Sequence, residues 1–294
     1  MRIQQTQSKQ IDYTVFGGYF MQPFQIPSTV QAIFFDLSGV LYEGDQAIAG
    51  ADESLRNLRK AGYILRFITN TASKTDTQLL NQLSAMGFEV YASELYTAGK
   101  AALSYIEEQA LNPYCIVHIN LKHLFAKFTP PFDSVLLSDA REALDYAALN
   151  KAFQLCHDGK TLIGLGHNRY FKAEQQLQLD AGPFIDMIAQ TTEQEAIIIG
   201  KPAAAFFHTV VQSTGVAAEH CLMLGDDVFG DIEGALTVGL NACLVQTGKY
   251  QTGDEQRLNP CCEVIQSVAD LQANSQLGHM APTVHEIANH SRHH

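Results

Sequence analysis

The sequence predicts an α/β protein built on a doubly wound parallel sheet. Short, continuous apolar runs recur along the chain, as expected of strands that are covered on both faces. Amphipathic helical patterns separate these runs, and strand–helix repetition of this kind is typical of a parallel sheet. The expected strands are Ala32–Phe35, Tyr63–Ile68, Tyr114–Ile119, Ser134–Leu137, Thr161–Leu165, Ala196–Ile199, Cys221–Leu224 and Ala242–Val245.

Three segments carry clear helical patterns. Residues Ala51–Ala61 are followed by Gly62, which favours a C-terminal stop. Residues Thr75–Met86 place their leucines on one stripe and end before Gly87. Residues Ala203–Ser213 carry a second apolar stripe. Each segment lies between two expected strands and predicts a helix that covers the sheet.

Composition and charge exclude several classes of protein. The chain has 294 residues, 46% of them hydrophobic, which is enough for one large domain or two ordinary ones. A net charge of -12 argues against a nucleic-acid partner. No apolar run approaches the ~20 residues that a membrane helix needs, and the N-terminus does not resemble a secretory signal. The six cysteines form no C-x-x-C array, which favours reduced thiols in a cytoplasmic protein.

The residues that follow the expected strands matter most, because ligands of doubly wound sheets bind beyond the carboxyl ends of the strands. Asp36 comes directly after the first strand and precedes a turn at Gly39. It therefore places a carboxylate at the mouth of the sheet, although an aspartate that only caps the turn would have the same pattern. Thr69 and Asn70 end the next strand and can bind phosphate oxygens, or they can cap the following helix.

Two later strand ends add opposite charges. Lys201 ends a strand before Pro202 and can neutralise a phosphate, unless it is an ordinary surface lysine. Asp226, Asp227 and Asp231 lie within six residues after a buried run. These carboxylates repel one another unless a cation lies among them, and oxygen ligands suit Mg²⁺. A solvated acidic loop is the alternative, but the buried run fixes this loop at the binding edge.

Together the four strand ends contain the parts of a phosphoryl-transfer site: a carboxylate nucleophile, neutral donors, a cation and a metal-binding loop. In this order the sequence resembles the haloacid dehalogenase superfamily of phosphatases over roughly residues 30 to 255. The matching motifs are Asp36-Leu-Ser-Gly-Val-Leu, Thr69-Asn70, Lys201-Pro202 and Gly225-Asp226-Asp227-x-x-x-Asp231.

An inserted domain follows from spacing, since about 130 residues separate Thr69 from Lys201. The resemblance identifies this insert as the large α/β cap of the type IIA subgroup. The segments His167–Lys172 and Thr247–Tyr250 are similar to the phospholysine phosphohistidine inorganic pyrophosphate phosphatase branch. The expected organisation is an N-terminal extension (1–28), a core (29–111 and 196–266), a cap (112–195) and a polar C-terminal tail (267–294).

The resemblance implies a role for each motif. Asp36 would attack phosphorus and form a phosphoaspartyl intermediate. Mg²⁺ would be held by Asp36, the backbone carbonyl of Ser38 and Asp226, with Asp227 or Asp231 holding metal-bound water. Thr69 and Asn70 would grip the phosphate, and Lys201 would balance charge.

The expected cap covers the site and selects a small phosphorylated metabolite. His167 and Arg169 end a cap strand and form the expected specificity loop. The guanidinium fork of Arg169 suits a carboxylate or second phosphate, whereas His167 is equally compatible with a structural or surface imidazole. The resemblance also implies a homodimer formed through the cap.

Ser38 departs from the usual pattern. Most phosphatases of the superfamily have a second aspartate at this position, which acts as general acid and base. Serine cannot supply a proton with a pKa near neutrality. We therefore expect an Mg²⁺-dependent phosphatase that favours activated phosphates, such as phosphoramidates, acyl phosphates or pyrophosphate. A catalytically silent phosphate-binding protein and a phosphotransferase remain as alternatives.

Overall fold

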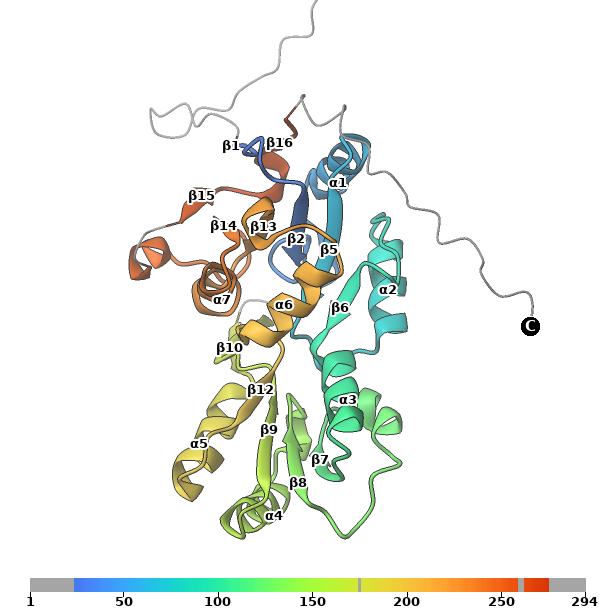
Figure 1. Cartoon of the computed structure of the whole chain (residues 1–294), viewed down its shortest axis with the longest axis vertical. Coiled ribbons are helices and arrows are strands. Elements are labelled where there is room, and N and C mark those ends of the chain that lie inside the picture. Colours follow the sequence, from blue (N-terminus) through green and yellow to red (C-terminus); the bar gives the residue numbers. More distant parts are fainter. Residues whose placement is uncertain (1–23, 174–175, 259–261, 275–294) are drawn as a thin grey trace, which may run out of the picture.

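The computed structural model describes residues 24–173, 176–258 and 262–274. Two α/β units are stacked along the long axis in Figure 1, each around its own parallel sheet. The expected extension lies mostly outside the described residues, as does most of the expected tail. The helices are α1 (Ala51–Lys60), α2 (Asp76–Ala85), α3 (Ala98–Glu108), α4 (Tyr146–His157), α5 (Gly182–Thr192), α6 (Ala204–Gln212) and α7 (Gly234–Thr237).

The core contains a six-stranded sheet in the order β15-β14-β13-β2-β5-β6, and all of its neighbouring strands are parallel. The central strand β2 lies between β13 and β5, so the ends of these three strands share one edge. The strands are β2 (Ala32–Asp36), β5 (Ile64–Thr69), β6 (Leu95–Thr97), β13 (Cys221–Gly225), β14 (Asn241–Val245) and β15 (Glu263–Ile265).

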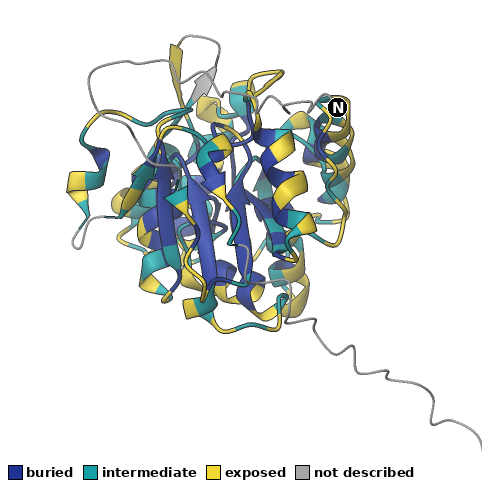
Figure 2. Ribbon diagram, turned by 90° about the horizontal axis from the view of Figure 1, so that it is seen from above, coloured by how far each residue is buried: buried dark blue, intermediate teal, exposed yellow. Residues whose placement is uncertain are grey.

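Apolar side chains alternate between the two faces of this sheet, as the pleat of a strand requires. Phe35 packs with Leu58 of α1 and Leu79 of α2 on one face. Phe34 packs with Phe207 of α6 on the other face. Seen from above in Figure 2, the strands are dark blue between helices whose outer faces are yellow. The predicted doubly wound α/β fold is thus confirmed, with central strands buried from both sides.

The cap has a four-stranded parallel sheet in the order β12-β9-β8-β7. Its strands are β7 (Pro113–Ile116), β8 (Ser134–Leu137), β9 (Thr161–Leu165) and β12 (Ile197–Ile199). One face packs against α4 and α5, where Ala152 and Ile185 are fully buried. The other face packs against α3, through Ala102 and Ile106.

The two sheets divide the chain differently from the expected boundaries at 112 and 196. Strand β12 pairs with cap strand β9, although we expected residues from 196 onward to belong to the core. Helix α3 contributes its buried face to a cap cluster, although it precedes residue 112. Both differences arise because an apolar run or stripe does not reveal which of two sheets it will join.

Two short antiparallel hairpins lie outside the two parallel sheets. The first follows the end of β2 and consists of β3 (Tyr42–Glu43) and β4 (Gln46–Ala47). The second lies in the cap and consists of β10 (Tyr170–Ala173) and β11 (Gln176–Leu179). Neither hairpin was expected from the sequence, because strands of two to four residues show no resolvable periodicity.

The last described residues pack on the core, contrary to the expected polar tail beginning at 267. Strand β16 (Leu271–Gln272) pairs with β1 (Phe24–Gln25). Val268 and Leu271 are buried in the main core cluster, so these apolar residues close the end of the sheet opposite the cap. Within the described ranges, no helix is long and apolar enough to cross a bilayer.

Candidate active site

Asp36 lies at the carboxyl end of β2 and is 7% exposed. The register places Asp36 beside Ile68 of β5, one residue before Thr69. On the other side, Phe35 lies beside Leu224 of β13, two residues before Asp226. Because parallel strands end at a common edge, the first, second and fourth motifs meet there.

Lys201 joins the nucleophile position to the acidic loop. Its Nζ lies 2.5 Å from Asp36 Oδ1 and 2.6 Å from Asp231 Oδ1. All three side chains are buried, with Lys201 itself 4% exposed. Two carboxylates are thus bridged by one ammonium, which offsets the repulsion that would otherwise separate them.

The surroundings shift the pKa values of Lys201 and Asp231, the two groups that lie next to Asp36 in this bridge. Burial by itself lowers the pKa of Lys201, but the attraction of Asp231 and Asp36 outweighs it and raises this pKa above its ordinary value. Burial raises the pKa of Asp231 to about 6; the Asp36 charge adds to the rise, and Lys201 opposes it. Lys201 therefore keeps its proton throughout the neutral range.

Asn70 holds the backbone of Lys201. Its Oδ1 accepts a hydrogen bond from the Lys201 amide at 2.8 Å, and its Nδ2 donates to the Lys201 carbonyl at 2.7 Å. The second hydrogen of Nδ2 is donated to Asn168 Oδ1 in the cap at 3.0 Å. Gly200 permits this approach, because a Cβ there would lie 2.6 Å from Asn70 Oδ1. Both amide hydrogens are thus engaged within the protein, where Asn70 positions Lys201 and contacts the cap, and its contact with phosphate stays a prediction.

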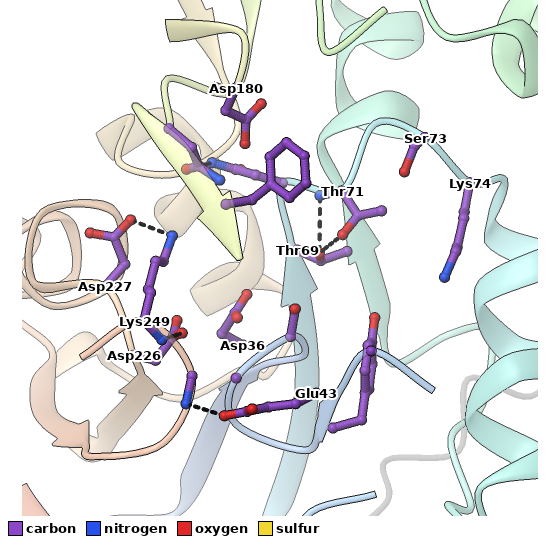
Figure 3. Close-up of a pocket in the computed structure, with 18 of the residues that line it drawn as sticks. Asp36, Glu43, Thr69, Thr71, Ser73, Lys74, Asp180, Asp226, Asp227 and Lys249 are labelled. Atoms are coloured by element: carbon purple, nitrogen blue, oxygen red, sulfur yellow. Dashed lines mark hydrogen bonds and ion pairs between the residues drawn. The ribbon is translucent and has the colours of Figure 1, made fainter. Parts of the chain in front are cut away.

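Thr69 and Thr71 form a small donor group beside Asp36 (Figure 3). Thr69 is 2% exposed, and its Oγ1 donates to Thr71 Oγ1 at 2.9 Å. Thr69 Oγ1 also accepts a hydrogen bond from the Thr71 amide at 3.0 Å. Both threonines line the cavity above Asp36, so their hydroxyl groups can reorient toward a phosphate oxygen.

Three carboxylates have the arrangement of a cation site. Asp36, Asp226 and Asp231 each present an oxygen, and these oxygens lie within 4.8 Å of one another. Asp226 Oδ2 accepts from the Lys249 amide at 2.8 Å, but its buried Oδ1 has no hydrogen-bond partner. Burial raises the pKa of Asp226 well above its ordinary range. A buried, unpartnered carboxylate oxygen is costly, and a bound cation would remove that cost. These residues therefore fit Mg²⁺.

Asp227 has other contacts. Its Oδ1 accepts hydrogen bonds from the amides of Phe229 and Gly230. Asp227 thereby caps the start of the π-helical turn Val228–Glu233. Its Oδ2 lies 2.7 Å from Lys249 Nζ. Although burial acts in the opposite direction, Lys249 and these amides lower the pKa of Asp227. Asp227 thus forms an internal ion pair next to the three-carboxylate group.

The segment 247–249 joins the nucleophile loop to the acidic loop. Thr247 Oγ1 donates to the carbonyl of Gly39, and the Gly248 amide donates to Glu43 Oε1 at 2.7 Å. Gly248 has a φ of +68°, and a Cβ there would lie 2.1 Å from Asp226 Oδ2. Lys249 then reaches both Asp226 and Asp227, as Figure 3 shows. From the sequence, this segment was expected only to resemble its counterpart in related phosphatases, and no role was predicted for it.

A cavity of about 810 Å³ opens above Asp36, between the core and the cap. Asp36, Ser38, Lys201 and the three acidic-loop aspartates line its core side. Ser38 is exposed there. Cap residues line the opposite side, and in Figure 3 Asp180 lies across the cavity from Asp36. The cap residues are Asp139, Arg141, Asn168, Phe171 and Asp180.

His167 and Arg169 lie elsewhere. Both line a second cavity of about 270 Å³. His167 Nε2 lies 2.7 Å from Asp186 Oδ1, and the Arg169 guanidinium stacks over Phe229, 5.0 Å from its ring centroid. Neither residue is among those lining the larger cavity. Of residues 167–169 in the expected specificity loop, only the middle one, Asn168, lines the larger cavity.

Arg141 and Lys249 are the principal site residues that sequence reasoning missed. Arg141 adopts a left-handed conformation with a φ of +52°, which is uncommon for a residue with a side chain. Arg141 could have been suspected from its position four residues after the buried strand Ser134–Leu137, because residues that follow such strands lie where ligands bind. Lys249 follows the buried strand Asn241–Val245 in the same way.

Comparison with known proteins agrees with this geometry. The haloacid dehalogenase-like hydrolase model matches residues 33–128, and the HAD-hydrolase-like model matches residues 198–271. Human haloacid dehalogenase-like hydrolase domain-containing protein 2 is 37% identical over 232 residues, covering 79% of this chain and 90% of that protein. Human phospholysine phosphohistidine inorganic pyrophosphate phosphatase is 35% identical over 233 residues, covering 77% and 86%.

Solved structures share the fold. The 4-nitrophenylphosphatase of Thermotoga maritima superposes with a TM-score of 0.75 at 23% identity, covering 82% of this chain and 96% of that one. NagD of E. coli K-12 gives a TM-score of 0.73 at 23% identity, covering 83% and 99%. With three motifs at one edge of the core sheet, Lys201 brought to them from the end of cap strand β12, and these sequence relatives, the chain belongs to the haloacid dehalogenase-like hydrolase family.

Proposed function

We propose that this protein is a Mg²⁺-dependent phosphatase that uses Asp36 as its nucleophile. The observation that carries the proposal is the buried group formed by Asp36, Lys201, Asp226 and Asp231. Lys201 joins two of these carboxylates, and the third has an oxygen without a partner. The names of the relatives support the reaction class, since one acts on phospholysine, phosphohistidine and inorganic pyrophosphate.

The charges of the site balance around one divalent cation. Asp36, Asp226, Asp227 and Asp231 contribute four negative charges when ionised, whereas Lys201 and Lys249 contribute two positive charges. The sum, -4 + 2 = -2, is offset by a single Mg²⁺. Held by Asp36, Asp226 and Asp231, Mg²⁺ would supply positive charge for the phosphate oxygens.

The chain's own residues would carry the reaction in two displacements. An oxygen of Asp36 attacks phosphorus, and the bond to the leaving group breaks with its electron pair on the leaving atom. Water then attacks phosphorus, and the Asp36–phosphate bond breaks to regenerate the carboxylate and release phosphate. Lys201 offsets the charge between nucleophile and phosphate throughout, and the Thr69 and Thr71 hydroxyls donate to its oxygens.

Ser38 shapes the substrate preference. It is exposed in the cavity beside the nucleophile and cannot act as a general acid near neutral pH. Leaving groups that depart without protonation are therefore favoured, as in phosphoramidates, acyl phosphates and pyrophosphate. The substrate is a small phosphorylated metabolite that fits the cavity beneath the cap.

A phosphate-release assay with Mg²⁺ tests this function. Wild-type protein and Asp36→Asn are compared on acetyl phosphate, imidodiphosphate and an alkyl phosphate. We expect release only from the wild type, lost by about 10³-fold or more in the variant. The exposed Asp158→Asn variant controls for handling. Saturable binding without release would indicate a binding protein, and release that depends on an acceptor other than water would indicate a phosphotransferase.

Two further expectations belong to this proposal. Cys115, Cys156, Cys221 and Cys243 are free thiols, which suits a reducing compartment such as the cytoplasm. Dimerisation through the cap is expected from the resemblance, and sedimentation analysis of the purified protein would test it.

A further inference from the structure

The cap side of the larger cavity contains one arginine, Arg141, that none of the four motifs includes. Its backbone φ of +52° is costly for a residue with a side chain. It lies just beyond β8, after the buried residues Ser138 and Asp139. Strain of this kind persists only where the surrounding structure fixes it, so the backbone that carries this side chain, at the start of the 3₁₀ turn Arg141–Ala143, is held in one conformation.

Three contacts fix the guanidinium of Arg141. Its Nε lies 3.0 Å from Asp139 Oδ2, and its Nη1 donates to Gln178 Oε1 at 3.3 Å. Its Cζ lies 4.0 Å from the centroid of the Phe171 ring, so one flat face is covered. An arginine has five N–H donors, and among the described residues one hydrogen bond, to Gln178, and one ion pair, with Asp139, engage this guanidinium. A pre-oriented guanidinium edge is thus left available at the cavity.

We propose that Arg141 is the specificity-determining residue of the cap and binds an anionic group, a carboxylate or a second phosphate, on the leaving group of the substrate. This inference rests on the proposed phosphatase function and adds the substrate class. A planar fork held by stacking and by an acidic partner loses little freedom when it binds an oxyanion.

The acids of the cap do not offer an equally good site for a cationic leaving group. Asp139 already pairs with Arg141. Asp180 accepts from the Ala181 amide at 2.7 Å, at the start of α5. Burial raises the pKa of Asp180, which disfavours its charged form. Recognition of an ammonium group by Asp180 is the competing outcome of the test.

The second cavity provides a matched control. Arg169 also stacks on a phenylalanine, but the ring is Phe229, and Arg169 lines only the second cavity, which shares Asn168, Asp226, Asp227 and Lys249 with the larger one. Arg141→Met and Arg169→Met thus remove the same chemical group from two comparable stacks. Methionine keeps much of the apolar stem, and at position 141 it meets the same backbone strain as arginine.

Three two-carbon phosphates that differ only in their end group serve as probes: 2-phosphoglycolate (carboxylate), ethyl phosphate (methyl) and phosphoethanolamine (ammonium). Their inhibition constants are measured against hydrolysis of p-nitrophenyl phosphate with Mg²⁺ present. In the wild type we expect 2-phosphoglycolate to bind about tenfold or more tightly than ethyl phosphate. This ratio falls to near one in Arg141→Met and persists in Arg169→Met. Pyrophosphate, tested in the same way, separates a second phosphate from a carboxylate.

The ratio distinguishes recognition from a general loss of structure, since a destabilised site weakens all probes alike. Arg141→Lys, which keeps the charge but not the fork, should give an intermediate ratio. Equal binding of the carboxylate and methyl probes by the wild type would overturn the proposal, as would an unchanged ratio in Arg141→Met or tightest binding of phosphoethanolamine. If p-nitrophenyl phosphate is not hydrolysed, the proposed function fails separately, and calorimetric titration with the same probes still measures the ratio.

Discussion

The two sides of the larger cavity are built in different ways. On the core side, Asp36 is buried at the end of β2, and Lys201, which follows cap strand β12, links it to the buried Asp231 by ion pairs of 2.5 and 2.6 Å. On the cap side, Arg141 and Phe171 extend from a short 3₁₀ turn in a connecting segment and from a short hairpin, and the Arg141 side chain is 30% exposed. A rigid sheet edge thus holds the groups that react with phosphate, whereas loops hold the groups that face the rest of the substrate.

This difference also predicts where charge matters for stability. Charges on the core side are desolvated, so each depends on its partner, whereas charges at the surface are supported by water. Substitutions on the core side should therefore change folding and chemistry together. Substitutions on the cap side should change selectivity or pH response with smaller effects on folding.

Removal of the bridging ammonium should have the largest effect. Lys201→Met leaves Asp36 and Asp231 buried side by side without their cation. We expect the free energy of unfolding to fall by about 3 to 5 kcal/mol, measured by urea denaturation in EDTA. The surface pair Lys127–Glu107, with side chains 52% and 54% exposed, provides the control. Lys127→Met should change stability by less than about 0.5 kcal/mol. Equal effects of the two variants would contradict the expected difference between buried and exposed charges.

Asp226 should link stability to the metal. Asp226→Asn removes a buried charge whose Oδ1 has no partner. In EDTA the variant should be at least as stable as the wild type. Mg²⁺ at about 100 times its dissociation constant should stabilise the wild type by about 2.7 kcal/mol and the variant by much less. Thermal unfolding with and without Mg²⁺ measures this, with Asp158→Asn as the control. An unaltered Mg²⁺ response in Asp226→Asn would remove Asp226 from the proposed metal site.

Ser38 lies on the core side but is expected to set substrate preference, because it replaces a general acid. Ser38→Asp introduces a carboxyl group that can protonate a poor leaving group. Turnover of an alkyl phosphate should rise by about 10²-fold, whereas that of acetyl phosphate should change little. Ser38→Asn has a similar shape without the acid and should lack this gain. The hypothesis fails if the wild type already hydrolyses the alkyl phosphate as fast as acetyl phosphate.

Asp139 should produce the smallest effect, which depends on pH. Burial raises the pKa of Asp139 from its ordinary 3.8 to about 6, although Arg141 opposes the rise. The folded state therefore binds this proton more tightly than the unfolded state, and the stability it contributes is lost as pH rises from about 4 through 6. Asp139→Asn should be more stable than the wild type by roughly 1 to 3 kcal/mol at pH 8 and nearly equal at pH 4. Urea denaturation at both pH values measures the difference, and a gain that is larger at pH 4 would reverse the assigned sign.

Sequence patterns predicted most of the fold, because a continuous apolar run is a local property. Runs such as Ser134–Leu137 and Thr161–Leu165 coincide with β8 and β9. The structure also brings Asp36, Lys201 and Asp231 together, as the strand ends suggested. It places Asp227 in an ion pair with Lys249 and leaves His167 and Arg169 outside the larger cavity. These three outcomes depend on contacts between distant segments.

Local patterns were enough to predict the long buried strands, the class of fold and the four motif positions, since each depends on residues close together in the chain. The contacts of Asn70 with Lys201, of Lys249 with the acidic loop, and of Arg141 rather than Arg169 with the larger cavity became visible only in three dimensions. Hydrophobic periodicity sets which residues are buried, whereas sheet register and cap orientation set which polar groups meet. No local pattern contains the second kind of information.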